Sequence, residues 1–138
     1  MKIKIIILFS FLTYQSCGIL TKVQDSSESS VVNLDRLDLE SKFIGKYDLE
    51  VFNLPDGRDG KFKMTVKKDG NILKTIFDDP SSADEFDILN TEIEEGILYI
   101  DVYVKDIGVN VFFEIYVDGN NVSGYLADMF KLEGKKIN

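Results

Sequence analysis

The sequence has no histidine, no tryptophan and one cysteine, Cys17, in 138 residues. Without histidine the chain lacks the side chain that most often acts as a general base near neutral pH and most often ligates metals. A single cysteine excludes an intramolecular disulfide and a zinc site built from several thiolates. These absences favour a binding or structural protein over an enzyme, and we expect neither a metal nor a soluble cofactor.

Basic residues are also few. Sixteen Lys and Arg stand against 24 Asp and Glu, which gives a net charge of −8. An acidic surface repels the phosphate backbone of nucleic acids and the headgroups of anionic lipids. We therefore expect no nucleic-acid partner and no electrostatic attachment to a membrane. The length suits one domain plus a leader, and we expect a monomer.

The apolar run at the N-terminus is short. Met1-Lys2-Ile3-Lys4 is basic, and residues 5–12 are apolar except for Ser10. A transmembrane helix needs about 20 apolar residues, so a retained membrane span is the weaker interpretation. A basic start, a short apolar run and a polar, small-residue end form the layout of a secretory signal peptide.

The segment Tyr14-Gln15-Ser16-Cys17 resembles a lipobox, although Tyr14 stands where leucine is usual. The resemblance implies a signal peptide over residues 1–16, and a diacylglyceryl group and an N-acyl chain on Cys17. We expect this covalent lipid to anchor the protein in the cell envelope, at the outer membrane, facing the periplasm or the surface. The alternative is ordinary cleavage after Gly18, since Ser16 and Gly18 satisfy the small-x-small rule.

Residues 17–43 are expected to form a lipidated tether with a short helix. Residues 25–30 are polar, small and acidic, so they bury too little apolar area to offset the entropy of ordering. Such a segment serves as a spacer, or is simply a terminus without a function. A helix over 34–42, capped by Asn33 or Asp35, is expected to pack against the opening of the sheet.

Residues 44–138 show short alternating apolar runs separated by Gly, Asp and Asn, as in all-β sandwiches and barrels. The expected strands are 46–53, 61–68, 71–78, 86–94, 97–105, 109–117, 122–128 and about 129–136. Asp69-Gly70 is a strong hairpin signal, and residues 78–85 are expected to be an irregular loop. The prediction is an antiparallel, eight-stranded, up-and-down β-barrel without sustained helix, since closure removes exposed edges.

Over residues 44–137 the chain resembles the small lipocalin-like β-barrel domains of Bacteroidota lipoproteins. The resembling segments are Gly45-Lys46-Tyr47, Asp69-Gly70-Asn71, Gly96-Ile97-Leu98, the run 118–124 and the closing run 130–136. The resemblance implies a domain that binds a small apolar or amphipathic ligand. Lipocalins proper are longer and carry tryptophan where Tyr47 stands.

The fifth and sixth expected strands carry the candidate site. One face of the pair is aliphatic and is predicted to be core: Leu98, Ile100, Val102, Val104, Val109, Val111, Phe113, Ile115 and Val117. The opposite face combines aromatic rings and carboxylates: Tyr99, Asp101, Tyr103, Phe112, Glu114 and Tyr116. With a turn at Asp106 and Ile107, Tyr103 pairs with Asn110, Asp101 with Phe112, and Tyr99 with Glu114. Such a face could bind a sugar or an amphipathic ligand, or could be an ordinary solvated sheet face.

The sequence gives less support to two further functions, glycoside hydrolysis and calcium binding. Asp101 and Glu114 could stand about 5 Å apart, as in a retaining glycosidase, but so small a domain has little room for a cleft around them. The acidic runs 56–60 and 78–85 are rich in oxygen ligands for calcium, although turn chemistry explains them as well.

The leading interpretation is thus a membrane-anchored envelope lipoprotein that binds a small apolar or amphipathic molecule. The alternatives are a carbohydrate- or protein-interaction module that uses the aromatic and acidic face, and a purely structural envelope protein.

Overall fold

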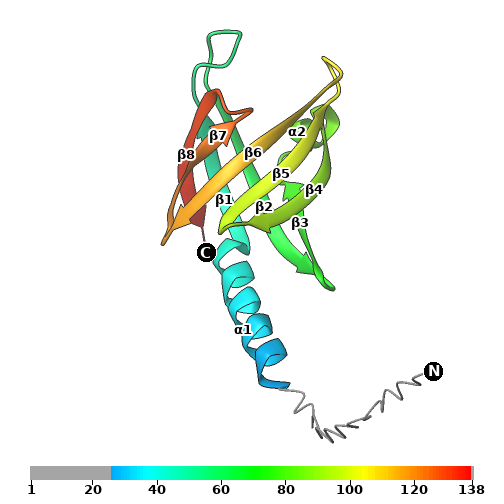
Figure 1. Ribbon diagram of the computed structural model, residues 1–138. Coiled ribbons are helices and arrows are strands. Elements are labelled where there is room, and N and C mark those ends of the chain that lie inside the picture. Colours follow the sequence, from blue (N-terminus) through cyan, green and yellow to red (C-terminus); the bar gives the residue numbers. More distant parts are fainter. Residues whose placement is uncertain (1–25, 138) are drawn as a thin grey trace, which may run out of the picture.

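A helix followed by eight antiparallel strands makes up the described part of the protein (Figure 1). The computed structural model describes residues 26–137, with side chains from residue 35. The predicted signal peptide, Cys17 and the first part of the tether lie outside these residues. The elements are α1 (Ser26–Phe43), β1 (Gly45–Val51), β2 (Gly60–Asp69), β3 (Ile72–Phe77), α2 (Pro80–Glu85), β4 (Phe86–Glu94), β5 (Ile97–Val104), β6 (Val109–Asp118), β7 (Asn121–Leu126) and β8 (Phe130–Ile137).

The strands form a nearly closed barrel. Their order is β3-β2-β1-β8-β7-β6-β5-β4, so β8 pairs back with β1. The two edges of the sheet, β3 and β4, face each other across a single seam. The predicted eight-stranded up-and-down barrel is confirmed, and every strand boundary lies within two residues of its expected position. What the sequence did not indicate is that closure stops short at β3 and β4.

Residues 78–85 are not the irregular loop that we expected, because Pro80–Glu85 forms the short helix α2. The Asp79 side chain caps it by accepting a hydrogen bond from the backbone N–H of Ser81 at 3.0 Å. Pro80 occupies the first turn, where its fixed φ fits a helix and its missing N–H costs nothing. Capping chemistry therefore makes a helix in a segment too short to show helical periodicity.

The helix expected over 34–42 is present but begins at Ser26, within the polar segment that we expected to be part of the tether. Its C-terminal end closes one end of the barrel (Figure 1). Phe43 is fully buried there, and its carbonyl accepts a hydrogen bond of 2.5 Å from the Tyr47 hydroxyl. Lys136 donates to the carbonyl of Lys42 at 2.8 Å. Neither α1 nor α2 is long and apolar enough to cross a bilayer.

Side chains from alternating strand positions fill the barrel. Ten side chains, nine from the strands and Phe43 from α1, are less than 2% exposed: Tyr47, Phe43, Leu49, Met64, Leu98, Ile100, Ile115, Leu132, Val66 and Val102. Four phenylalanines from β2, β3, β4 and β6 pack together with ring centroids 5.3–6.4 Å apart. Of the predicted core face, Val109 is an exception at 41% exposed, because it follows the β5–β6 turn at the very start of its strand.

Two glycines allow neighbouring strands to approach closely. A Cβ atom on Gly124 in β7 would lie 1.9 Å from the carbonyl oxygen of Glu114 in β6. A Cβ atom on Gly134 in β8 would lie 2.2 Å from the carbonyl oxygen of Asp48 in β1. Glycine at these positions permits the tight bending that a small barrel needs.

Candidate functional site

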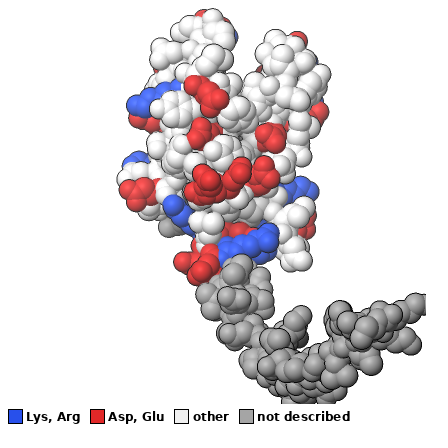
Figure 2. Space-filling model, in the orientation of Figure 1, with Lys and Arg blue, Asp and Glu red and all other residues white. Residues whose placement is uncertain are grey.

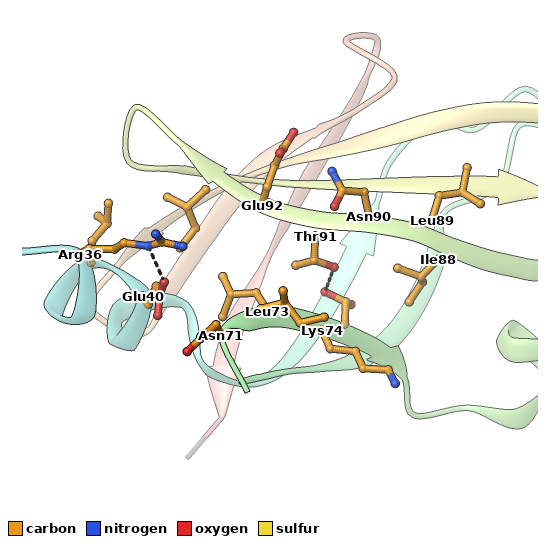
Figure 3. Close-up of a pocket in the computed structure, with 14 residues that line it drawn as sticks. Arg36, Glu40, Asn71, Leu73, Lys74, Ile88, Leu89, Asn90, Thr91 and Glu92 are labelled. Atoms are coloured by element: carbon orange, nitrogen blue, oxygen red, sulfur yellow. Dashed lines mark hydrogen bonds and ion pairs between the residues drawn. The ribbon is translucent and has the colours of Figure 1, made fainter. Parts of the chain in front are cut away.

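A groove of about 630 Å³ opens along the seam between β3 and β4 (Figure 3). It is lined by Arg36, Leu39 and Glu40 from the end of α1, by residues 71–75 and by residues 88–93. The groove exists because β3 and β4 are the two edges of the sheet, so the spacing there is not set by a backbone ladder. We call this feature the seam groove.

The inner side of the seam groove is apolar. Leu73 from β3 and Ile88 and Ile93 from β4 are partly buried and pack against the barrel core. Strand β4 carries a register shift between Ile88 and Asn90. This bulge leaves Leu89 56% exposed at the rim and lets Ile88 and residue 91 both face inward. An apolar floor with open sides suits an amphipathic molecule.

One hydrogen bond crosses the seam inside the barrel. The Thr91 hydroxyl of β4 donates to the Thr75 hydroxyl of β3 at 2.9 Å (Figure 3). Thr75 is only 3% exposed, so its hydroxyl needs a partner. A side-chain contact thus takes the place of backbone pairing at this point and holds the two edges at a fixed separation.

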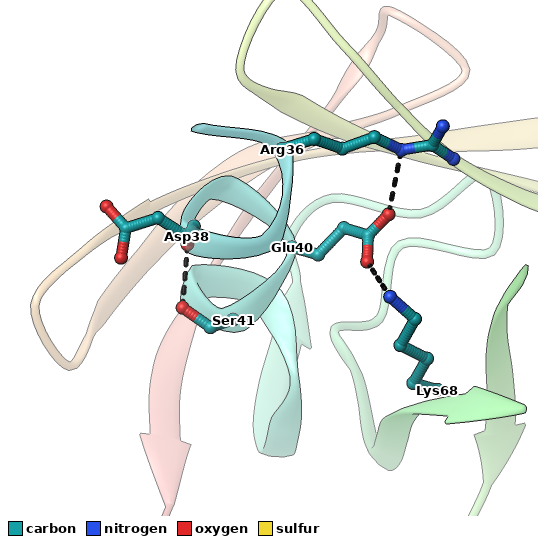
Figure 4. A network of polar contacts seen from close by, with 5 residues as sticks. All are labelled: Arg36, Asp38, Glu40, Ser41 and Lys68. Atoms are coloured by element: carbon teal, nitrogen blue, oxygen red, sulfur yellow. Dashed lines mark hydrogen bonds and ion pairs between the residues drawn. The ribbon is translucent and has the colours of Figure 1, made fainter. Parts of the chain in front are cut away.

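Charged residues close the α1 end of the seam groove (Figure 4). The Glu40 carboxylate lies between two cations: Arg36 Nε at 3.0 Å and Lys68 Nζ at 2.5 Å. The Glu40 side chain is 9% exposed, whereas that of Arg36 is 69% exposed. Arg36 precedes Glu40 by one helical turn, which places both on the same side of α1. The four-residue spacing therefore brings Arg36 and Glu40 together, and Lys68 comes from the end of β2.

The cations control the ionisation of Glu40. The hydrogen bond from Lys68 is the main reason that the pKa of Glu40 lies below its usual value, and Arg36 adds to it. Burial opposes them by disfavouring the charged form, but the cations prevail. Glu40 is therefore a carboxylate at neutral pH, and the cluster carries one net positive charge.

A second hollow, of about 640 Å³, lies on the outer wall over β1, β7 and β8. Its charged residues pair with neighbours on the sheet surface: Lys61 with Glu50 at 3.4 Å, and Glu133 with Lys131 at 2.6 Å. These pairs are what an ordinary solvated sheet face carries. The seam groove, with its apolar floor, is the stronger candidate.

The structure brings the six sequence-predicted site residues together on one outer face. Tyr99 pairs with Glu114, Asp101 with Phe112, and Tyr103 with Asn110, so the predicted register is confirmed. Tyr99, Asp101, Tyr103, Phe112 and Glu114 are partly buried, and Tyr116 is exposed. None of the six lines the seam groove.

Glu114 organises this face. The Tyr116 hydroxyl donates to its carboxylate, and this bond is the main reason that the pKa of Tyr116 is raised to about 12. Burial, followed by the nearby Glu114 charge, raises the pKa of Tyr99. Both hydroxyls therefore remain protonated donors at neutral pH. Asp101 lies opposite Phe112 rather than Glu114, so the two carboxylates do not form a directly facing pair.

The outer surface is electrically uneven. Residues 86–128, which include β4 to β7, contain nine Asp and Glu and a single basic residue, Lys105. The other residues with described side chains contain thirteen acidic and twelve basic residues. Figure 2 shows acidic side chains gathered across the face formed by β5 and β6. The net negative charge of the barrel thus lies almost entirely on one half.

The acidic turns are occupied by local hydrogen bonds. Asp56 accepts from the backbone N–H of Arg58 at 3.0 Å, and Asp59 accepts from that of Asn53 at 3.0 Å. Asp79 caps α2. Among the residues with a described position, no group of three or more His, Cys, Asp or Glu is arranged to hold a metal ion.

Sequence reasoning missed the seam groove. Its residues come from three segments far apart in the chain, and its existence depends on two strands that do not pair. A local signal was present in β4, where Ile88-Leu89 interrupts the alternation that places Thr91 and Ile93 inward. Cys17, the predicted lipid site, lies outside the described residues.

No protein family, no curated protein and no solved structure matches this chain. A functional proposal therefore has to come from the groove and the outer face themselves.

Proposed function

We propose that this protein is a lipid-anchored envelope protein, attached through Cys17, whose lipocalin-like barrel binds a small amphipathic molecule in the seam groove. The observation that carries the binding role is the groove between β3 and β4, with an apolar floor and a charged end. The barrel interior is filled by side chains, so the ligand site is the seam rather than a central cavity. Binding, and not catalysis, is the proposed activity.

Exposed apolar side chains support this site. Ile72 is 65% exposed and Leu89 is 56% exposed, and they lie on opposite sides of the seam groove. Leu39, at 37% exposed, belongs to the same groove at the α1 end. Large exposed apolar side chains gathered around one concave feature are typical of binding sites rather than of ordinary surface.

Nile red, an uncharged dye that fluoresces in apolar sites, tests the proposal. The full chain should bind the dye, and decanol should displace it. Ile72→Glu should weaken dye binding by about tenfold, which corresponds to a lost apolar contact of about 1.4 kcal/mol. Ile107→Glu is the matched control, since Ile107 is 69% exposed and lies in the β5–β6 turn, outside the groove. Equal loss in both variants, or no dye binding, would overturn the proposal.

A second candidate uses the outer face of β5 and β6. The six predicted residues do share one face, and Tyr116 is 38% exposed beside the carboxylate of Glu114. Such a face could bind a carbohydrate or a protein partner. Tyr103→Ala and Tyr116→Ala should then abolish binding to a glycan array or partner without lowering the melting temperature. A purely structural envelope role predicts no binding by either site.

A further inference from the structure

A smaller polar hollow adjoins the seam groove at the α1 end. Its volume is about 290 Å³, and it is lined by Arg36, Leu37, Glu40, Lys68 and Asn71. Arg36, Glu40 and Asn71 also line the seam groove. The site as a whole therefore has an elongated apolar part between β3 and β4 and a compact polar end beside α1.

The polar end carries a positive charge. Arg36 and Lys68 contribute two cations, and Glu40 contributes one carboxylate, which leaves a net charge of +1. The whole chain carries −8, so this end of the groove is opposite in sign to the protein around it. Asn71 adds an amide group at the junction of the two hollows.

Both cations have hydrogen-bonding capacity beyond Glu40. Arg36 contacts Glu40 through Nε, and a guanidinium group has two further nitrogens with four N–H donors. Lys68 contacts Glu40 through one ammonium group, which has three N–H donors. Figure 4 shows the terminal nitrogens of Arg36 pointing away from Glu40. A second anion can therefore be bound without breaking either ion pair.

We propose that the ligand of the seam groove is an anionic amphiphile, whose apolar chain lies along β3 and β4 and whose carboxylate or phosphate head binds Arg36 and Lys68. This inference rests on the proposed binding function and adds the chemical class of the ligand. At the polar end a cationic head would meet two like charges, and the Glu40 carboxylate there already has two partners. The groove lining also includes one further carboxylate, Glu92, and one further cation, Lys74, so the net charge of the two hollows together remains +1. An uncharged head would gain little from the charged end.

Displacement of Nile red by four amphiphiles of equal chain length tests the head group: decanoate, decyl phosphate, decanol and decyltrimethylammonium. Each is used below its micelle concentration at neutral pH. Decanoate or decyl phosphate should compete about three- to tenfold better than decanol, as expected for a partly exposed charge-assisted contact. The two anions together distinguish a carboxylate from a phosphate ligand. Decyltrimethylammonium should compete least.

Substitutions at the polar end show which residues bind the charged head group of the ligand. Arg36→Gln should remove most of the preference for the anions and leave displacement by decanol unchanged. Arg58→Gln is the matched control, because Arg58 is also an exposed arginine paired with a carboxylate, that of Asp56, and lies in the β1–β2 loop. Glu40→Gln should strengthen anion binding severalfold, since it removes the competing carboxylate. A merely structural role for Glu40 predicts the reverse.

The outcomes separate the two proposals. If decanol and the anions compete equally well, and Arg36→Gln changes nothing, the anionic ligand is refuted while the groove remains a binding site. If no amphiphile displaces Nile red, the proposed function itself fails. Anion preference that persists in Arg36→Gln and in Lys68→Gln would also refute the assignment of the head-group site.

Discussion

The contact between α1 and the barrel can be tested by removing one oxygen atom. Tyr47 is fully buried at the start of the barrel, and its hydroxyl donates to the carbonyl of Phe43, the last residue of α1. The last carbonyls of a helix have no partner within the helix, so this one depends on Tyr47. Tyr47→Phe keeps the ring and deletes the donor.

The expected cost follows from burial. A buried carbonyl that loses its donor retains its desolvation penalty, which is about 1–3 kcal/mol. The apolar contacts of the ring are unchanged, so little is lost beyond this term. We therefore expect the free energy of unfolding to fall by about 1–3 kcal/mol. For a domain of this size each kcal/mol lowers the melting temperature by about 4–8 °C.

Urea unfolding followed by circular dichroism measures this change. Tyr125→Phe is the control, because Tyr125 is 44% exposed on the outer wall, and it should change stability by less than about 0.5 kcal/mol. If Tyr47→Phe is as stable as the wild type, the hydroxyl does not hold α1 on the barrel. The Tyr47 hydrogen bond would then not be what positions the α1 end of the seam groove.

Three further predictions concern the barrel, its titration and the anchor. Gly124→Ala should destabilise the barrel by about 3 kcal/mol or more in urea unfolding, because backbone must move to admit the Cβ atom, whereas Ser123→Ala should be nearly neutral. Burial raises the pKa of Tyr47 to about 12 against 10 when unfolded, so the folded state binds the proton more tightly. Stability should thus be full below about pH 10 and fall between pH 10 and 12, and a pH titration of Tyr47→Phe should lack this component. Cys17→Ser should abolish incorporation of radiolabelled palmitate during expression in a lipoprotein-processing bacterium; unchanged labelling would refute acylation at that residue.

The sequence predicted the barrel because each strand is marked locally. Alternating burial and glycine-containing turns such as Asp69-Gly70 and Glu95-Gly96 give the boundaries, and Gly70 and Gly96 adopt the positive φ that these turns need. The register of β5 against β6 followed from a single short turn, and all three predicted pairs are present. Local signals suffice where consecutive strands pair.

The seam groove depends on a relation that local signals do not contain. Whether β3 and β4 pair is decided by how the whole sheet bends, and that bending depends on close approaches such as the one at Gly124. The ion pair between Glu40 and Lys68 joins residues 28 positions apart. Arg36 and Glu40 were within reach of sequence reasoning, since they are one helical turn apart, but nothing in the sequence placed that turn beside β3.

Helix α1 connects the predicted anchor to the proposed site. The helix ends at the barrel with Phe43 buried, and its last two turns supply Arg36, Leu39 and Glu40 to the seam groove. A perturbation of α1 near the barrel should therefore alter ligand binding as well as stability.

Nuclear magnetic resonance can show whether an amphiphile binds in the seam groove or on the outer face of β5 and β6. Isotope-labelled protein is mixed with decanoate, and intermolecular nuclear Overhauser effects are recorded from the chain methylenes of the ligand. Binding in the seam groove predicts contacts to Leu73, Ile88 and Ile93 along the seam and to Leu39 on α1. Contacts instead to Tyr99 and Phe112 on the outer face, or none at ligand saturation, would contradict it.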